Sequence, residues 1–120
     1  MLLSLPELIQ QAAQNVRRID AATAYAEGQS EPSWFIDVRE PGEVAERAIP
    51  GSVNIPRGVL EMKMVEHCPD ADTPVFIHCA SSARATLAAE QLQRIGYTRV
   101  SVITCALDTI SEVQGGQSSS

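Results

Sequence analysis

The sequence has no excess of positive charge, no long apolar run and no signal-peptide pattern. Its 120 residues include 9 lysines and arginines against 15 aspartates and glutamates, a net charge of −6. Most of this surface would repel a phosphate backbone, so we expect no nucleic-acid partner. No stretch is long enough to span a membrane, and no basic region precedes an apolar segment at the N-terminus. We therefore expect no membrane partner and no signal peptide.

Cysteines are also few, and their number is odd. The chain has Cys68, Cys79 and Cys105, which do not make a paired disulfide framework and suit a reducing compartment such as the cytoplasm. Their spacing is not Cys-x-x-Cys. His67 and His78 each stand directly beside a cysteine, where neighbouring side chains diverge and do not converge on a metal. We predict a cytoplasmic protein without a metal and without a cofactor.

The composition is that of an ordinary globular protein, with 44% hydrophobic and 20% charged residues. A chain of this length can bury one core but is too short for two. We predict one domain over residues 1–114. The last residues, 115–120, contain only Gly, Gln and Ser, so we predict a flexible C-terminal tail there.

Segments typical of strands and segments typical of helices alternate along the chain. Three short apolar runs, at 34–38, 74–78 and 99–103, are typical of buried strands. The segments between and after them have helical character, and capping residues at Ser4 and Asp20 predict two earlier helices. Helices are expected near 5–16, 21–28, 41–48, 58–67, 84–95 and 106–113, with an edge strand at 16–19. This order predicts an α/β fold with a mainly parallel sheet.

The segment after the second apolar run carries the chemistry. The expected strand leads into Cys79, then into the small residues Ala80, Ser81, Ser82 and Ala83, and then into Arg84 at the start of a helix. Amides of a tight loop and the N-terminus of a helix stabilise an anion, so they and Arg84 favour the nucleophilic thiolate of Cys79. A buried structural cysteine before an ordinary helix cap is also compatible with this pattern. The loop alone does not decide between the two interpretations.

Two further motifs resemble a known family. Asp37-Val38-Arg39-Glu40 follows the first apolar run, the segment 49–56 reads Ile-Pro-Gly-Ser-Val-Asn-Ile-Pro, and the cysteine loop lies downstream of both. Over residues 15–107 the chain resembles the rhodanese-like sulfurtransferases. The resemblance implies a five-stranded, mainly parallel sheet with helices on both faces. It also implies that the cysteine loop lies at the carboxyl ends of the strands, where open α/β sheets bind ligands.

The resemblance also implies an activity. Cys79 would accept sulfane sulfur from a small donor such as thiosulfate and pass it to a thiol, to cyanide or to a protein acceptor. Residues 80–84 would bind the donor, and Asp37 and Arg39 would brace the loop without reacting. On this interpretation the chain is an enzyme of the thiosulfate sulfurtransferase type, or a persulfide carrier, and needs no cofactor.

Two departures from the family pattern leave alternatives open. Ser82 stands where many members have glycine, and a positive φ there would cost about 1 kcal/mol. Cys105 replaces part of a common Gly-Gly after the last strand. We hypothesise that Cys105 resolves a persulfide or an oxidised Cys79 by forming a disulfide; otherwise it is a small buried residue.

The alternatives differ in function as well. Ser82 and the sparse charge of the loop also fit a rhodanese module with little turnover and a binding or regulatory role. A cysteine-dependent phosphatase is the third candidate, although four residues separate Cys79 from Arg84 where the phosphatase motif has five. The acidic residues Glu40, Glu43 and Glu46 are interpreted as a solvated helix face.

Overall fold

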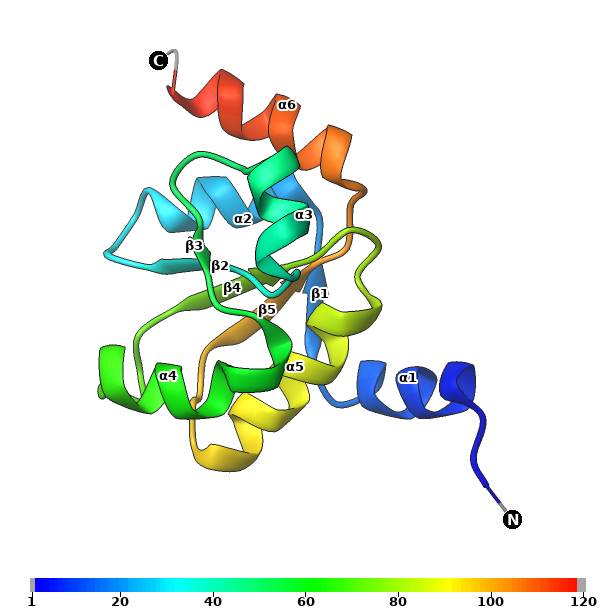
Figure 1. Cartoon of the computed structure of the whole chain (residues 1–120). Helices are drawn as coiled ribbons and strands as arrows, with labels where there is room; N and C mark the ends of the chain where they lie inside the picture. The colour runs from blue at the N-terminus through cyan, green and yellow to red at the C-terminus, as the bar shows by residue number, and fades with distance from the viewer. Residues whose placement is uncertain (1, 119–120) are drawn as a thin grey trace.

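Short, largely apolar strands form a parallel sheet at the centre of the fold. The computed structural model describes residues 2–118. The strand order is β1-β5-β4-β2-β3, and each neighbouring pair is parallel (Figure 1). The five strands are β1 (Arg17–Ile19), β2 (Trp34–Asp37), β3 (Val53–Asn54), β4 (Val75–His78) and β5 (Val100–Ile103). β4 and β5 are buried along their whole length, as continuous apolar runs require.

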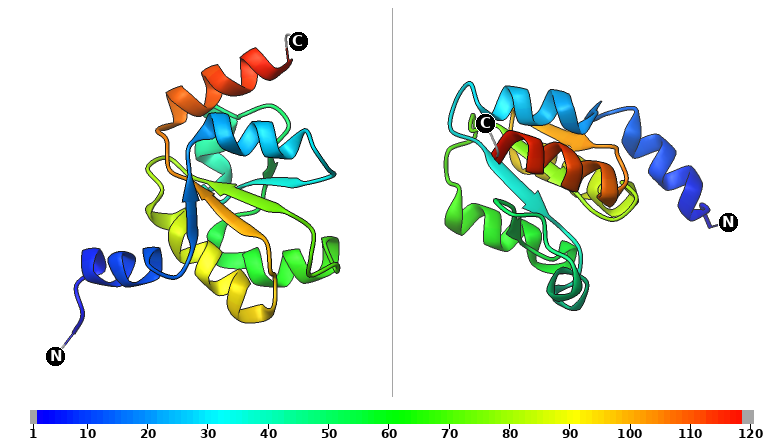
Figure 2. Two further views of the ribbon diagram at one scale, coloured as in Figure 1. Left: turned by 180° about the vertical axis from the view of Figure 1, so that it is seen from behind. Right: turned by 90° about the horizontal axis from the view of Figure 1, so that it is seen from above.

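Helices cover both faces of this sheet. α4 and α5 lie on one face and α2 and α6 on the other, whereas α1 contacts α5 and projects away from the rest of the fold (Figure 2). The helices are α1 (Leu5–Ala13), α2 (Ala21–Gly28), α3 (Pro41–Glu46), α4 (Leu60–His67), α5 (Ala83–Ile95) and α6 (Leu107–Ser118), with a 3-10 turn η1 at Arg57–Val59. The predicted α/β fold class is confirmed. Within residues 2–118, no helix is both long enough and apolar enough to cross a membrane.

Capping residues set the ends of several helices. The Ser4 hydroxyl accepts a hydrogen bond from the Glu7 backbone N–H at 3.2 Å, and the Asp20 carboxylate accepts one from the Thr23 N–H at 2.8 Å. Each satisfies an amide that has no partner inside its own helix. α5 ends at Ile95 and is followed by Gly96, whose φ of 131° is suited to glycine. These helix boundaries follow the predicted ones.

The core has two layers because successive strand residues point to opposite faces. On the α4 and α5 side, strand residues such as Ile77 and Val102 pack against alanines of α5, whose small side chains let the helix approach closely. On the α2 and α6 side, Phe35 stacks between Tyr25 and Phe76, with ring centroids 4.5 and 4.8 Å apart. Each layer covers one face of the sheet and holds the ends of the strands in place.

The C-terminal region differs from its prediction. α6 continues to Ser118 and includes Gly115 and Gly116, where the sequence predicts a flexible tail from residue 115. Ile110 is fully buried and Val113 packs beside it, so the helix is anchored by tertiary contacts that outweigh the low helical propensity of glycine. Residues 119 and 120 of the predicted tail lie outside the described residues. The division at residue 114 stays a prediction.

Candidate functional site

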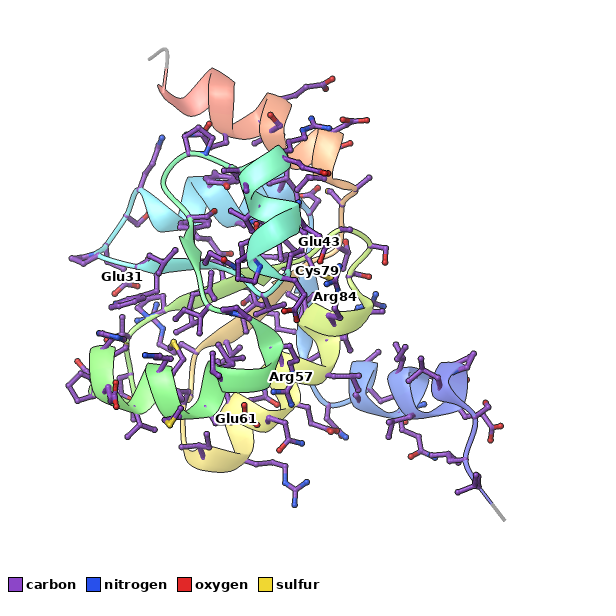
Figure 3. All side chains as sticks on the ribbon, viewed as in Figure 1. Glu31, Glu43, Arg57, Glu61, Cys79 and Arg84 are labelled. Atoms are coloured by element: carbon purple, nitrogen blue, oxygen red, sulfur yellow. The ribbon has the colours of Figure 1, made fainter. Side chains whose placement is uncertain are left out.

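The predicted cysteine loop lies at the carboxyl edge of the sheet. β4 ends at His78, Cys79 follows it, and α5 begins at Ala83. α3 follows β2 at the same edge, because all the strands run in the same direction. Figure 3 shows Cys79, Arg84 and Glu43 gathered where α3 approaches the start of α5. The topology therefore assembles three segments around Cys79.

Cys79 is buried at the base of the loop. The residue is 1% exposed and belongs to the core layer beneath α5. Its Sγ accepts a hydrogen bond from the Ala85 backbone N–H at 3.4 Å. Ala80 and Ser81 are exposed above it, and Ser82, Ala83 and Arg84 are half-buried. An amide of the first turn of α5 thus points at the sulfur, an arrangement that favours a thiolate or a persulfide anion.

Ser82 has the strained backbone that the sequence suggested. Its φ is 76°, and it is the one non-glycine residue with positive φ in the described part of the chain. The left-handed conformation costs about 1 kcal/mol for a residue with a Cβ. The Ser82 carbonyl accepts hydrogen bonds from both the N–H and the hydroxyl of Thr86, each at 2.8 Å. These two bonds hold the turn in the conformation that closes the loop over Cys79.

Arg84 does not point freely into the loop, because it forms an ion pair with Glu43 of α3. Its Nη1 and Nη2 donate to the two carboxylate oxygens of Glu43 at 2.6 and 2.9 Å. These two bonds, and a third one from the Glu40 backbone N–H, lower the pKa of Glu43 to about 2. Glu43 is thus a partly exposed residue of the acidic helix face that also forms an ion pair, which the sequence did not indicate. The pair neutralises the cation that the sequence assigned to donor binding.

Asp37 and Arg39 form a buried pair below this site. The Arg39 Nη2 and Nε donate to the Asp37 carboxylate at 2.7 to 3.1 Å, and Nη2 also donates to the Arg47 carbonyl at 2.6 Å. The Asn54 amide donates to the carbonyls of both Asp37 and Arg39 at 3.0 and 2.9 Å. The pair therefore ties the end of β2 to β3 and to the end of α3. This geometry is consistent with the predicted bracing role, which stays a prediction.

His78 is next to Cys79 in sequence but lies on the other face of the sheet. Its Nε2 is 3.0 Å from the Ser52 hydroxyl. Burial lowers the pKa of His78; Asp37 opposes this effect and Arg39 adds to it. Strand alternation alone predicts that the two neighbouring side chains diverge. His78 therefore belongs to the packing of the second layer and does not contact the Cys79 sulfur.

Cys105 is likewise separated from Cys79. Its Sγ accepts a hydrogen bond from the Ala21 N–H at 3.3 Å, and it packs with the core layer of α2 and α6. Cys79 belongs to the layer on the other side of the sheet. Both cysteines follow strands that end at the same edge, as the sequence suggested, but the structure does not bring their sulfurs together. The resolving role of Cys105 stays a prediction without geometric support.

One cation near the loop was missed in the sequence. The Arg18 Nη2 of β1 lies 3.4 Å from the Ser82 hydroxyl. The two residues are far apart in the chain, so no motif contains both. Arg18 could have been predicted to lie near the loop only from the position of β1 beside β5. That position depends on the strand order, which the sequence does not show directly.

A family model described as the rhodanese-like domain matches residues 20–112. The chain belongs to the rhodanese-like domain family. It is 35% identical over 71 residues to a sulfurtransferase of Allochromatium vinosum, a match covering 59% of this chain and 64% of that protein. The chain spans about half to two thirds of the length of the curated relatives that it matches. The predicted family is therefore confirmed.

Solved structures agree with the rhodanese fold. A polysulfide-sulfur transferase homodimer from Wolinella succinogenes has a TM-score of 0.74 and 26% identity, over 88% of this chain and 80% of that one. A Rhodopseudomonas palustris protein of unknown function, described as a possible tyrosine phosphatase, has a TM-score of 0.79 over 93% and 92% of the two chains. Its identity of 23% shows the shared fold alone.

Proposed function

We propose that this rhodanese-like protein is a sulfurtransferase that carries sulfane sulfur on Cys79 as a persulfide. The observation that supports this proposal most directly is the buried Cys79 sulfur with the Ala85 amide of α5 pointing at it. An anion on that sulfur is stabilised by the amide and by the helix N-terminus. The similarity to the A. vinosum sulfurtransferase and to the W. succinogenes polysulfide-sulfur transferase supports the same chemistry.

The reaction needs no group beyond the donor and the acceptor. The Cys79 thiolate attacks the outer sulfur of thiosulfate, and a new S–S bond forms. The S–S bond of thiosulfate breaks, and its electron pair leaves with sulfite. Cyanide or a thiolate then attacks the terminal sulfur of the persulfide and returns Cys79 to the thiolate. A protein thiol in the second step would make the chain a sulfur carrier between proteins.

A low-turnover module is the second candidate, because two observations weaken the site for a dianion. Arg84 is neutralised by Glu43, and Ser82 holds a strained conformation in the loop. Such a module would bind a sulfur donor or a partner protein without rapid transfer. A phosphatase is less well supported, since the loop is one residue shorter than the phosphate-binding motif.

Mass spectrometry of the intact protein after incubation with thiosulfate tests the proposal. We expect a gain of one sulfur atom in the native protein and in Cys105→Ser, and none in Cys79→Ser. No gain from thiosulfate, from inorganic polysulfide or from an organic trisulfide would contradict the sulfur-carrier proposal. Cyanide-dependent release of thiocyanate then separates an enzyme from a low-turnover module. Release of phosphate from an aryl phosphate would instead support the phosphatase.

A further inference from the structure

We propose that Arg18 of β1 binds the oxyanion end of the sulfur donor at the mouth of the Cys79 loop and so selects donors of the thiosulfate and thiosulfonate class. This inference rests on the proposed sulfur transfer at Cys79. It assigns a donor-binding role to a strand that carries no family motif in this sequence.

Register places Arg18 on the same face of the sheet as Cys79. Arg18 of β1 pairs with Val102 of β5, and Val102 pairs with Ile77 of β4. Residues in register across a parallel sheet point to the same face, and residues two apart in a strand do so as well. Cys79 is two residues after Ile77 and packs in the same core layer as Val102 and Ile77. Arg17, one residue earlier, points to the other face and pairs with Glu27 of α2.

The edge position of β1 lets the Arg18 side chain reach the loop. β1 pairs with β5 on one side only, so its residues are not covered by a further strand. The Arg18 Nη2 lies 3.4 Å from the Ser82 hydroxyl, three residues after Cys79. That distance is at the long end for a hydrogen bond between neutral and charged groups. A donor oxygen can therefore replace the serine hydroxyl without the loss of a strong bond.

Arg18 differs from the other arginines near this edge because no carboxylate of the described residues neutralises its charge. It is exposed and forms no ion pair with any residue among 2–118. The others are each paired with a carboxylate: Arg39 with Asp37, Arg47 with Asp108, Arg57 with Glu61 and Arg84 with Glu43. Arg18 is thus the uncompensated positive charge beside the loop. It attracts an incoming anion that the net charge of −6 would otherwise repel.

A guanidinium suits the oxyanion end of such a donor. Its planar fork can donate to two oxygens of a sulfonate group at once, which orients the group as well as attracting it. With the oxygens on Arg18, the outer sulfur of thiosulfate is the part left to approach Cys79. The same contact stabilises the sulfite that leaves when the S–S bond breaks. Donors without an oxyanion, such as neutral trisulfides, gain nothing from this contact.

Loading kinetics with two donors test the inference. The second-order rate of sulfur loading is measured with thiosulfate and with dimethyl trisulfide for the native protein, Arg18→Gln, Arg18→Glu and Arg94→Gln. Arg94 is exposed in the last turn of α5, roughly 16 Å along the helix from its start, so Arg94→Gln matches the charge change of Arg18→Gln at a distance. We expect Arg18→Gln to slow loading by thiosulfate about tenfold, and Arg18→Glu to slow it further.

Loading by dimethyl trisulfide should be unchanged in both Arg18 variants, and Arg94→Gln should behave as the native protein with both donors. The loss in Arg18→Gln should shrink at high salt, where exposed charges are screened. Native-like loading of Arg18→Gln by thiosulfate would overturn the inference while leaving the sulfur-carrier proposal intact. Equal slowing with both donors, or equal slowing in Arg94→Gln, would overturn it too. Failure of the native protein to load from either donor would instead contradict the proposed function.

Discussion

The two carboxylate–arginine pairs beside the Cys79 loop differ sharply in their surroundings. The Asp37–Arg39 side chains are 2% and 4% exposed, whereas those of Glu43 and Arg84 are 39% and 37% exposed. Arg39 is also held by the Arg47 carbonyl, and Asp37 by the Arg39 backbone N–H at 3.0 Å. The first pair is locked inside the fold and the second stands at the mouth of the site.

Burial gives the two pairs different consequences. Removing one member of a buried pair leaves the other charge without a partner and without water, so the buried pair controls stability. An exposed pair is screened by solvent and contributes little to folding. Its effect is instead local, because it determines whether Arg84 presents a free positive charge near Cys79. One pair therefore supports the site, and the other adjusts its charge.

The largest expected effect is on stability. Arg39→Met leaves Asp37 buried without its partner, and we expect a loss of about 3–5 kcal/mol in the free energy of unfolding. Urea denaturation measures it. Combining Arg39→Met with Asp37→Asn should recover part of the loss, because the buried charge is then gone. A loss no larger than that of Glu43→Gln would show that the two pairs do not differ in the way proposed.

A smaller effect, on the rate of sulfur loading, is expected at the exposed Glu43–Arg84 pair. Glu43→Gln removes the carboxylate that neutralises Arg84, so loading of sulfur from thiosulfate should become about threefold faster, with little change in the unfolding midpoint. Glu46→Gln is the matched control, since Glu46 is exposed on the same helix and makes no ion pair among the described residues. Equal acceleration in both variants would mean that overall charge, and not the release of Arg84, sets the rate.

The most local expected effect, confined to one side chain, is in the titration of Glu43. Its pKa is lowered from 4.5 to about 2, first by the Arg84 hydrogen bonds. A carboxyl with a lowered pKa stabilises the folded state above its ordinary pKa, and this contribution disappears as the pH falls towards 2. In Arg84→Gln the pKa of Glu43 should move back towards 4.5, as followed by NMR of the side-chain carboxyl carbon. An unchanged titration would show that Arg84 is not the cause.

Much of the fold was predictable because its signals are local. The caps at Ser4 and Asp20 lie within three residues of the amides they satisfy, and the strands are continuous apolar runs. The length of α6 was not predictable in this way. Glycines and serines in its last turns indicate flexibility locally, but the buried Ile110 anchors the helix. Tertiary contacts decided its length.

The candidate site also has some features with local sequence signals and others that depend on tertiary contacts. The sequence by itself determined the loop from Cys79 to Arg84 and the strained position of Ser82, because each lies in one continuous segment. It also determined the family, because each family motif is a short local stretch and the motifs follow in the expected order along the chain. Only the tertiary structure decided that Arg84 is neutralised by Glu43, 41 residues away, and that Arg18 reaches Ser82 across 64 residues. It also placed Cys105 in the opposite core layer from Cys79. The physical reason is that strand order and the alternation of side chains set which distant charges meet, and neither is written in a local pattern.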